Sequence, residues 1–344
     1  MKSIEIEESI GKDYNYLDTR SPSEFSIDHV PGAFNIPIFD DSQRKEIGIL
    51  YKADKQKAFD LGIQYYSKKL PLLVEEIRKL PRNKPLIIYC WRGGMRSKAV
   101  TQLADLLGYR AFQLKGGYKA YRNFTRENLY NYTPGFRFIV LWGMTGTAKT
   151  RMIRQLSPSL DLEGLAQHRS SLFGAIGLEP RSQKYFESLF YFELLRLEKE
   201  NFVFTEGESK KIGEVTIPKS VYKHIEKGIN VKVNCSLKKR VQNTVEEYFS
   251  EGNISQIKSI IPFLKQKLGK KRIGDLLDYM NKGQYENVAE ILLTEYYDPL
   301  YKHTIDNIDY DYTIDGDDIK QAIKQLNDIY NKLGQKKQKI DCGI

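Results

Sequence analysis

Two stretches of the chain share one layout, and together they restrict the fold more than any other feature. "IIYCWRGGMRSKAV" (residues 87–100) and "FIVLWGMTGTAKT" (residues 138–150) each pass from an apolar run through a glycine-containing loop into a helical pattern. A short apolar run bounded in this way is typical of a buried parallel strand. A loop between such a strand and a helix presents backbone N–H groups to an anion. The sequence therefore predicts two strand–loop–helix units, each with an anion-binding loop.

Strand and helix patterns alternate around both loops, which predicts an α/β fold with parallel sheets. The strands expected are in residues 14–18, 85–90, 109–114, 136–142, 201–209 and 230–236. The helices expected are in residues 68–80, 97–107, 149–156 and 181–200. We divide the chain into a first domain at 1–124, a linker at 125–135, a second α/β domain at 136–236, and a mostly helical, basic region at 237–344.

Charge and cysteine content narrow the class of protein. The 344 residues carry a net charge of +10, which favours an acidic partner, with nucleic acid first among the candidates. Cys90, Cys235 and Cys342 are too few and too far apart for a disulfide framework or a zinc site. The N-terminus is unlike a signal peptide, and no apolar run is long enough to cross a bilayer. A reduced, cytoplasmic protein without a membrane partner is expected.

The first loop places a cysteine where an anion-binding loop begins. Cys90 is followed by Trp91, Arg92, Gly93, Gly94, Met95, Arg96 and Ser97. Loop N–H groups and nearby arginines favour the thiolate form of such a cysteine. The glycines let the backbone curl around a sulfur, selenium or phosphate atom, and the arginines can add charge-assisted hydrogen bonds.

These residues resemble a rhodanese domain over about residues 4–124. The resemblance is carried by "LDTRSPSEF", "HVPGAFNIP", "YCWRGGMRS" and "LKGGY". In that family the loop cysteine carries a persulfide or a related chalcogen. Five residues separate Cys90 from Arg96, one more than single-domain rhodaneses usually have, and this resembles the phosphatases built on the same fold. A phosphatase therefore stays open as an alternative. We expect Asp18 to support the fold through hydrogen bonds.

The second loop resembles a P-loop, whose pattern is G-x-x-x-x-G-K-[ST]. Its residues are Gly143, Met144, Thr145, Gly146, Thr147, Ala148, Lys149 and Thr150. Lys149 and Thr150 fit the phosphate-binding lysine and the hydroxyl that can hold Mg²⁺, whereas Ala148 stands where glycine usually precedes the lysine. Glu206 and Glu208 end the following strand, where an acid on the metal side of a P-loop site would lie.

A rhodanese domain followed directly by a P-loop domain resembles the bacterial tRNA 2-selenouridine synthase family. Further segments that match this family are residues 40–52, 161–174, 206–218 and 296–301. His168 and Arg169 lie in the second of these segments and are candidates for a nucleotide or a diphosphate. Ser170 stands where the family more often has glycine.

The resemblance implies two reactions at the wobble 2-thiouridine of certain tRNAs. The sulfur is first alkylated with a geranyl group from geranyl diphosphate, and selenium from selenophosphate then replaces the S-geranyl group. Lys149 and Thr150 would bind phosphate groups, Cys90 would handle selenium directly or through a perselenide, and Mg²⁺ is a candidate at Glu206 and Glu208. A selenophosphate-producing enzyme is a candidate partner.

The basic end of the chain suits phosphate contacts and shape recognition of folded RNA. The candidates for tRNA contact are Lys238, Lys239, Arg240, Lys265, Lys267, Lys270, Lys271 and Arg272. Three alternatives remain open from the sequence. They are a cysteine phosphatase fused to a kinase-like module, a persulfide carrier that binds tRNA for another enzyme, and an ATP-dependent kinase with a regulatory rhodanese domain.

Overall fold

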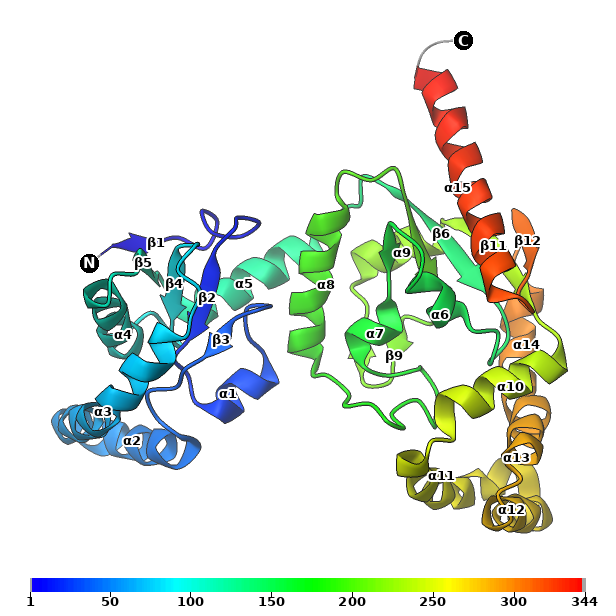
Figure 1. Ribbon diagram of the computed structural model, residues 1–344, viewed down its shortest axis with the longest axis horizontal. Helices are drawn as coiled ribbons and strands as arrows, with labels where there is room; N and C mark the ends of the chain where they lie inside the picture. The colour runs from blue at the N-terminus through cyan, green and yellow to red at the C-terminus, as the bar shows by residue number, and fades with distance from the viewer. Residues whose placement is uncertain (1, 342–344) are drawn as a thin grey trace. The chain divides into compact units, whose positions relative to one another are not determined.

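The computed structural model describes residues 2–341, with side chains described up to residue 335, so Cys342 lies outside the described residues. The chain forms two compact units. Residues 1–131 and 182–195 make unit 1, and residues 132–181 and 196–344 make unit 2 (Figure 1). The predicted α/β class is confirmed, because each unit contains a five-stranded parallel sheet with helices around it.

Unit 1 is built on a sheet in the order β1-β5-β4-β2-β3. The strands are β1 (Ser3–Ile4), β2 (Asn15–Asp18), β3 (Phe34–Asn35), β4 (Leu86–Tyr89) and β5 (Ala111–Leu114). The helices are α1 (Pro22–Ile27), α2 (Asp41–Ala53), α3 (Lys55–Arg78), α4 (Met95–Leu106), α5 (Gly117–Tyr130) and most of α8 (Gln183–Leu197).

The central strand β4 is apolar throughout because both faces of the sheet are covered. Leu86 and Ile88 point into a core shared with α3 and α4, whereas Ile87 and Tyr89 point into a second core shared with α5. This two-sided burial is the usual state of a parallel sheet and explains why the strand shows no alternation of polar residues.

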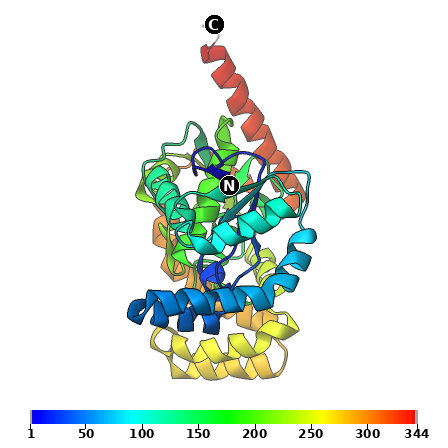
Figure 2. The ribbon, with the colours of Figure 1, turned by 90° about the vertical axis from the view of Figure 1, so that its left-hand side faces the viewer.

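Two helical segments in unit 1 differ from expectation. Helix α3 begins at Lys55, well before residue 68, and packs along α2 as a helical pair (Figure 2). Asp54 caps it by accepting hydrogen bonds from the N–H groups of Gln56 and Lys57, both at 3.0 Å. Helix α5 continues to Tyr130, through the first half of the segment expected to be a linker, because Leu129 is fully buried and extends its apolar face.

Helix α8 is compact with unit 1 although it lies within the sequence of the second domain. Ser188 Oγ donates to Asp28 Oδ1 at 2.8 Å, and Glu187 forms an ion pair with Arg122. Both acids are at most 1% exposed. These buried polar contacts join residues far apart in the sequence, so no local pattern could have indicated them.

Unit 2 has the strand order β12-β11-β6-β8-β7. Its strands are β6 (Arg137–Trp142), β7 (Ser159–Leu160), β8 (Phe202–Glu206), β11 (Ile229–Asn234) and β12 (Tyr312–Asp315), and β9 (Lys211–Ile212) and β10 (Val215–Thr216) form a separate hairpin. Its first helices are α6 (Lys149–Ile153), α7 (Leu162–Ala166), α9 (Lys219–Glu226) and α10 (Leu237–Tyr248). The later ones are α11 (Ile254–Ile260), α12 (Lys265–Asn281), α13 (Tyr285–Ile291), α14 (Asp298–Asp306) and α15 (Ile319–Asp341). Short 3₁₀ turns cover Glu251–Asn253 and Ile261–Leu264, and a π-helical turn covers Leu292–Tyr297.

Strand β12 lies in the region expected to be mostly helical. It pairs in parallel with β11, with Ile314 opposite Val233, and both side chains lie in the core that α6 and α15 cover. A separate helical core holds α10 to α13 together around residues such as Leu276 and Leu293. The parallel sheet therefore ends in a strand that the chain supplies only after this helical region.

Candidate active sites

Cys90 follows β4 at the carboxyl edge of the unit 1 sheet. Its side chain is buried, with the residue 3% exposed, and the N–H of Gly94 donates to Sγ at 3.2 Å. Ser97 Oγ lies 3.2 Å from the same sulfur. The Gly94 N–H is thus a donor to the sulfur, whereas in the Ser97–Cys90 pair either atom can donate and the Ser97 hydroxyl also donates to the Gly94 carbonyl at 3.2 Å.

The shape of the Cys90 loop is set by groups outside it. The side-chain amide of Gln113 donates to the carbonyls of Gly93 (2.8 Å) and Gly94 (3.1 Å). At the start of α5, the N–H of Tyr118 donates to the carbonyl of Cys90 at 2.8 Å. Gly117 has φ 59°, and a Cβ there would lie 2.2 Å from the Cys90 carbonyl oxygen. The "LKGGY" segment is therefore glycine-rich because its backbone presses against the cysteine loop.

The remaining loop residues divide into charged and apolar groups. Arg96 is tied to Glu24 at 3.2 Å, which leaves other N–H groups of its guanidinium for an anion. Burial opposes ionisation of Glu24, but the charges of Arg96 and Arg44 outweigh it, so the pKa of Glu24 is lowered. Arg92 is exposed, as are the apolar side chains of Trp91 and Met95.

Asp18 has the structural role expected of it. It is fully buried, and its carboxylate accepts hydrogen bonds from the backbone and the guanidinium of Arg20, including Nε at 2.9 Å. The Arg20 guanidinium also lies 3.8 Å from the ring centre of Tyr118. Asp18 is therefore held as the partner of a buried arginine.

The second loop wraps from β6 into α6 as a P-loop does. Lys149 Nζ donates to the Gly143 carbonyl at 2.8 Å, so the lysine folds back over the mouth of the loop. Ala148 adopts the left-handed conformation with φ 58° and ψ 29°. Alanine therefore stands in place of the usual glycine, in a backbone region that its Cβ disfavours. Ser170, which faces the same pocket, also has a positive φ of 50°.

Helix α10 holds the outer side of this loop, which corrects one expectation. Arg240 is 6% exposed, its Nε donates to the Thr145 carbonyl at 2.8 Å, and its NH1 donates to Asp298 at 3.0 Å. Asn243 donates to the Gly146 carbonyl at 2.9 Å. Arg240 was expected to contact tRNA; it is instead a buried support of the P-loop, because its guanidinium is already occupied by Asp298 and the loop.

Three acids lie at the P-loop, and the sequence pointed to two of them. Glu206 is fully buried, its Oε2 accepts from the N–H of Leu162 at 3.1 Å, and its Oε1 has no partner. Burial raises the pKa of Glu206 well above 4.5, and burial also raises the pKa of Glu208 although Lys149 opposes this.

The third acid, Glu163, was missed by sequence reasoning. Its Oε2 accepts from Thr150 Oγ1 at 2.8 Å, and burial together with the Glu208 charge raises its pKa to about 8. It lies within the segment 161–174 that carried the family resemblance, at the start of α7, and that position was the only signal available.

Thr150 and the carboxylates of Glu163 and Glu208 line the P-loop pocket and are the kind of oxygen ligands that Mg²⁺ binds, whereas Glu206, which was expected to share this role, does not line the pocket. Among the residues that the structure describes, no group of three or more His, Cys, Asp or Glu side chains has the geometry of a metal site. Any Mg²⁺ here would therefore depend on substrate phosphates and water for most of its ligands.

His168 and Arg169 are adjacent in the sequence, but their side chains lie in different surroundings. Arg169 lines the P-loop pocket, forms an ion pair with Glu247 at 2.7 Å, and lies 4.8 Å from the ring centre of Tyr248. His168 does not line that pocket; its ring lies against the backbone of Gly174 and Gly213. Of this pair, Arg169 alone lines the P-loop pocket.

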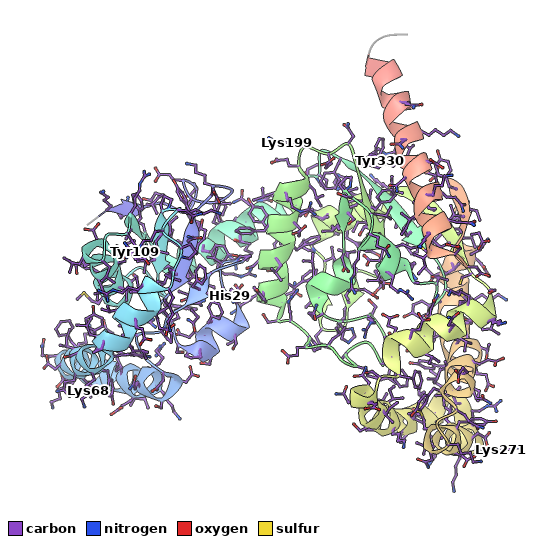
Figure 3. All side chains as sticks on the ribbon, viewed as in Figure 1. His29, Lys68, Tyr109, Lys199, Lys271 and Tyr330 are labelled. Atoms are coloured by element: carbon purple, nitrogen blue, oxygen red, sulfur yellow. The ribbon has the colours of Figure 1, made fainter. Side chains whose placement is uncertain are left out.

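The exposed lysines of the helical region remain available to a polyanion. Lys265, Lys267, Lys270 and Lys271 are exposed on α12, which is interrupted at Gly269 with φ 79°. Lys271 lies at the outer edge of the helices α11 to α13 (Figure 3). Lys238 is exposed, Lys239 is half-buried, and Arg272 is paired with Glu295.

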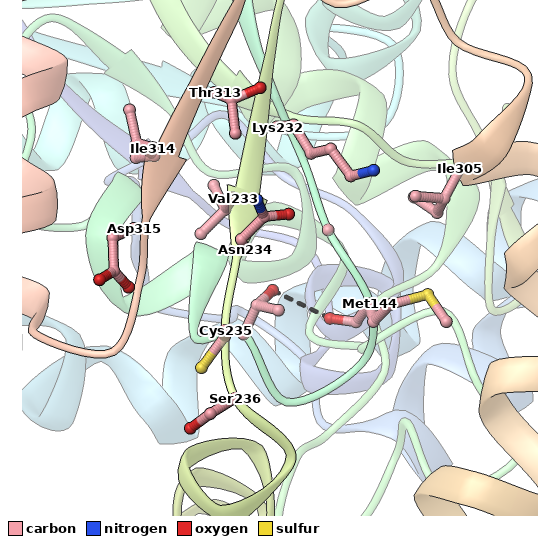
Figure 4. A pocket seen from close by; sticks show the side chains of 12 residues that line it. Met144, Lys232, Val233, Asn234, Cys235, Ser236, Ile305, Thr313, Ile314 and Asp315 are labelled. Carbon is pink, nitrogen blue, oxygen red and sulfur yellow. Dashed lines mark hydrogen bonds between the residues drawn. The ribbon is translucent and has the colours of Figure 1, made fainter.

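Two pockets adjoin the P-loop. One, of about 270 Å³, contains Lys149, Thr150, Glu163, Arg169 and Glu208. The other, of about 680 Å³, opens between the first half of the loop and the ends of β11 and β12, with Met144, Lys232, Asn234 and Thr313 at its walls (Figure 4). The two pockets share Gly143, Thr147 and Ile305.

The fold and the two loops define a class of α/β protein in which a rhodanese-like domain precedes a P-loop domain. Comparison of the sequence with known families agrees with this description. A "Rhodanese-like domain" profile matches residues 5–124, and a "tRNA 2-selenouridine synthase AAA domain" profile matches residues 136–332.

Curated relatives cover most of the chain. The tRNA 2-selenouridine synthase of Hydrogenovibrio crunogenus is 30% identical over 339 residues, covering 88% of this chain and 92% of the relative. Those of Nitrosomonas europaea (31%, covering 83% and 87%) and Sulfurovum sp. (29%, covering 84% and 88%) are similar. The chain belongs to the tRNA 2-selenouridine synthase family, as its sequence motifs predicted. In the described residues, no helix is long and apolar enough to cross a membrane.

Proposed function

We propose that this protein makes 2-selenouridine at the wobble position of tRNA in two steps, with one anion-binding loop serving each step. The observation that carries the proposal is the pairing of a thiol loop in unit 1 with a phosphate loop in unit 2. A phosphate-bearing selenium donor and a diphosphate alkyl donor are different anions. Two loops of different chemistry suit these two donors better than they suit a single substrate.

In the first step, the P-loop binds the diphosphate of geranyl diphosphate through its N–H groups and Lys149. The sulfur of 2-thiouridine forms a bond to carbon 1 of the geranyl chain, and the C–O electron pair leaves with the diphosphate. The proton on N3 of the base passes to solvent. When Mg²⁺ is bound, it neutralises charge on the leaving diphosphate; Thr150, Glu163 and Glu208 would hold it, directly or through water.

In the second step, the Cys90 thiolate handles selenophosphate. Its sulfur attacks phosphorus, and the P–Se bond breaks with its electron pair on selenium. The hydrogen selenide then adds to carbon 2 of the base, geranylthiol leaves after taking a proton from solvent, and water releases phosphate from the cysteine. A perselenide on Cys90 is the other route, but it requires a two-electron oxidant that neither donor supplies, so we favour the direct route.

The five residues between Cys90 and Arg96 support this assignment, because a longer loop can surround a tetrahedral phosphate. The loop provides the Gly94 N–H and Ser97 Oγ at the sulfur.

The exposed lysines of α12 would contact the tRNA backbone. A selenophosphate-producing enzyme would supply the donor.

The experiment is nucleoside mass spectrometry of 2-thiouridine tRNA after incubation with geranyl diphosphate, selenophosphate, or both. The wild-type protein should yield the geranylated nucleoside with the first donor and 2-selenouridine with both. Cys90→Ser should stop at the geranylated nucleoside, and Lys149→Ala should slow its formation. Cys235→Ser is the matched control and should behave as wild type.

Other results would favour the alternatives. Phosphate release from aryl phosphates without any change in tRNA would support a rhodanese-fold phosphatase. Sulfur loading on Cys90 without a modified nucleoside would support a persulfide carrier fused to a phosphate-binding module. Selenium incorporation by folded Cys90→Ser would contradict the role assigned to Cys90.

A further inference from the structure

We propose that four aromatic side chains in the P-loop pocket form the binding site for the hydrocarbon chain of the prenyl diphosphate. They are Trp142, Tyr222, Tyr248 and Tyr301. The inference rests on the proposed function, because it concerns the donor of the first step. It adds which residues hold the hydrocarbon chain.

The aromatic residues come from four elements that meet only in the folded unit. Trp142 ends β6, Tyr222 lies on α9, Tyr248 ends α10 and Tyr301 lies on α14. They share one pocket of about 270 Å³ with the P-loop and Lys149. Phosphate groups alone need N–H donors and cations, so four aromatic rings among the lining residues indicate a ligand that also has an apolar part.

Several contacts hold these rings in place before any ligand binds. Trp142 Nε1 donates to Asn230 Oδ1 at 2.9 Å, and a Cβ on Gly207 would lie 2.3 Å from the indole, so the backbone of Gly207 packs on its face. The Tyr222 hydroxyl donates to the Glu208 carbonyl at 3.3 Å. A site whose rings are fixed loses little side-chain entropy when it binds a flexible chain.

The rings also suit the chemistry of an allylic donor. As the C–O bond breaks, positive charge develops on carbons 1 and 3 of the chain. Neutral aromatic faces attract positive charge, most strongly where water is excluded. Burial raises the pKa of Tyr301 to about 12, so its ring stays neutral at physiological pH. The Tyr248 ring already faces the Arg169 guanidinium at 4.8 Å, so Tyr248 is assigned apolar contact with the chain and not charge stabilisation.

The larger neighbouring pocket is the competing location for the chain. Its sheet face carries Lys232, Asn234 and Thr313, and Asn234 and Thr313 are exposed (Figure 4). The apolar side chains of Val233 and Ile314 belong to the core on the other face of the sheet. Met144, Cys235 and Ile305 also line this pocket, so it offers apolar contacts too; the smaller pocket differs because it holds four aromatic rings together with Lys149.

The test compares the affinities of geranyl diphosphate and inorganic diphosphate for the full-length protein by titration calorimetry. Tyr301→Ala should weaken geranyl diphosphate relative to inorganic diphosphate by about tenfold, the usual effect of removing one buried ring. Tyr301→Phe keeps the ring and should keep the wild-type ratio. Tyr222→Ala and Tyr222→Phe form a second matched pair with the same expectation.

A variant that fills the competing pocket completes the experiment. Thr313→Trp, at an exposed position on β12, should leave the ratio of the two affinities unchanged. A selective loss of geranyl diphosphate in this variant, or equal losses of both ligands in Tyr301→Ala and Tyr222→Ala, would overturn the inference alone. A wild-type protein that binds neither ligand would overturn the proposed first step and this inference with it.

Discussion

The left-handed conformation of Ala148 predicts that Ala148→Gly stabilises unit 2. At φ 58° and ψ 29° the alanine Cβ crowds the following carbonyl, which costs roughly 1–2 kcal/mol. Glycine removes this strain, but its freer unfolded chain costs about 0.5–1 kcal/mol. The net gain is about 0.5–1 kcal/mol in the free energy of unfolding. For a unit of this size that corresponds to a rise of about 2 °C in Tm.

The assay is thermal unfolding of the full chain by calorimetry. The transition that added diphosphate shifts is assigned to unit 2, and its Tm is compared between the variant and the wild type. Ala99→Gly in the right-handed helix α4 is the control for the substitution itself, and because Ala99 lies in unit 1 its effect is followed through the transition that diphosphate does not shift. The same substitution there should lower the free energy of unfolding by about 1 kcal/mol. If Ala148→Gly lowered Tm as the control does, the strain assigned to this residue would be wrong.

Three further predictions follow from buried or exposed charges. Arg240→Ala should lower the free energy of unfolding by about 3–5 kcal/mol in denaturant titrations, because Asp298 loses its partner. The double variant Arg240→Met, Asp298→Leu should lower it by less. Equal losses in the two variants would argue against the ion pair. Burial raises the pKa of Glu163 from 4.5 to about 8, so the folded state keeps a proton that the unfolded chain releases, and stability should fall as pH rises across that window. Because Glu206 and Glu208 also have raised pKa values, Glu163→Gln should make this fall less steep in unfolding measurements without ligand, and an unchanged slope would contradict the assignment. Four exposed lysines of α12 can be replaced together by alanine: Lys265, Lys267, Lys270 and Lys271. This should reduce the slope of log tRNA affinity against log salt concentration by about three. An unaltered slope would exclude this helix as the tRNA contact.

The local motifs were predictable because they depend on neighbouring residues. Strand β4 and the Cys90 loop follow from an apolar run that meets two glycines, and the P-loop follows from the spacing of Gly143, Lys149 and Thr150. The same reasoning failed for β12, whose four residues are mostly polar and form a strand only because β11 is there to pair with. It also could not assign α8 to unit 1, since its partners Asp28 and Arg122 precede it by more than sixty residues.

The sequence by itself determined the α/β class, the two strand–loop–helix units and the family, because each is written in short segments whose residue types restrict the backbone. Only the tertiary structure decided how the P-loop is supported and what surrounds it. Arg240 became a buried support, Glu163 became the partner of Thr150, and four distant aromatic residues came to share one pocket. These outcomes depend on which surfaces meet when the sheet and helices pack, and contacts between distant segments leave no periodic pattern in the chain.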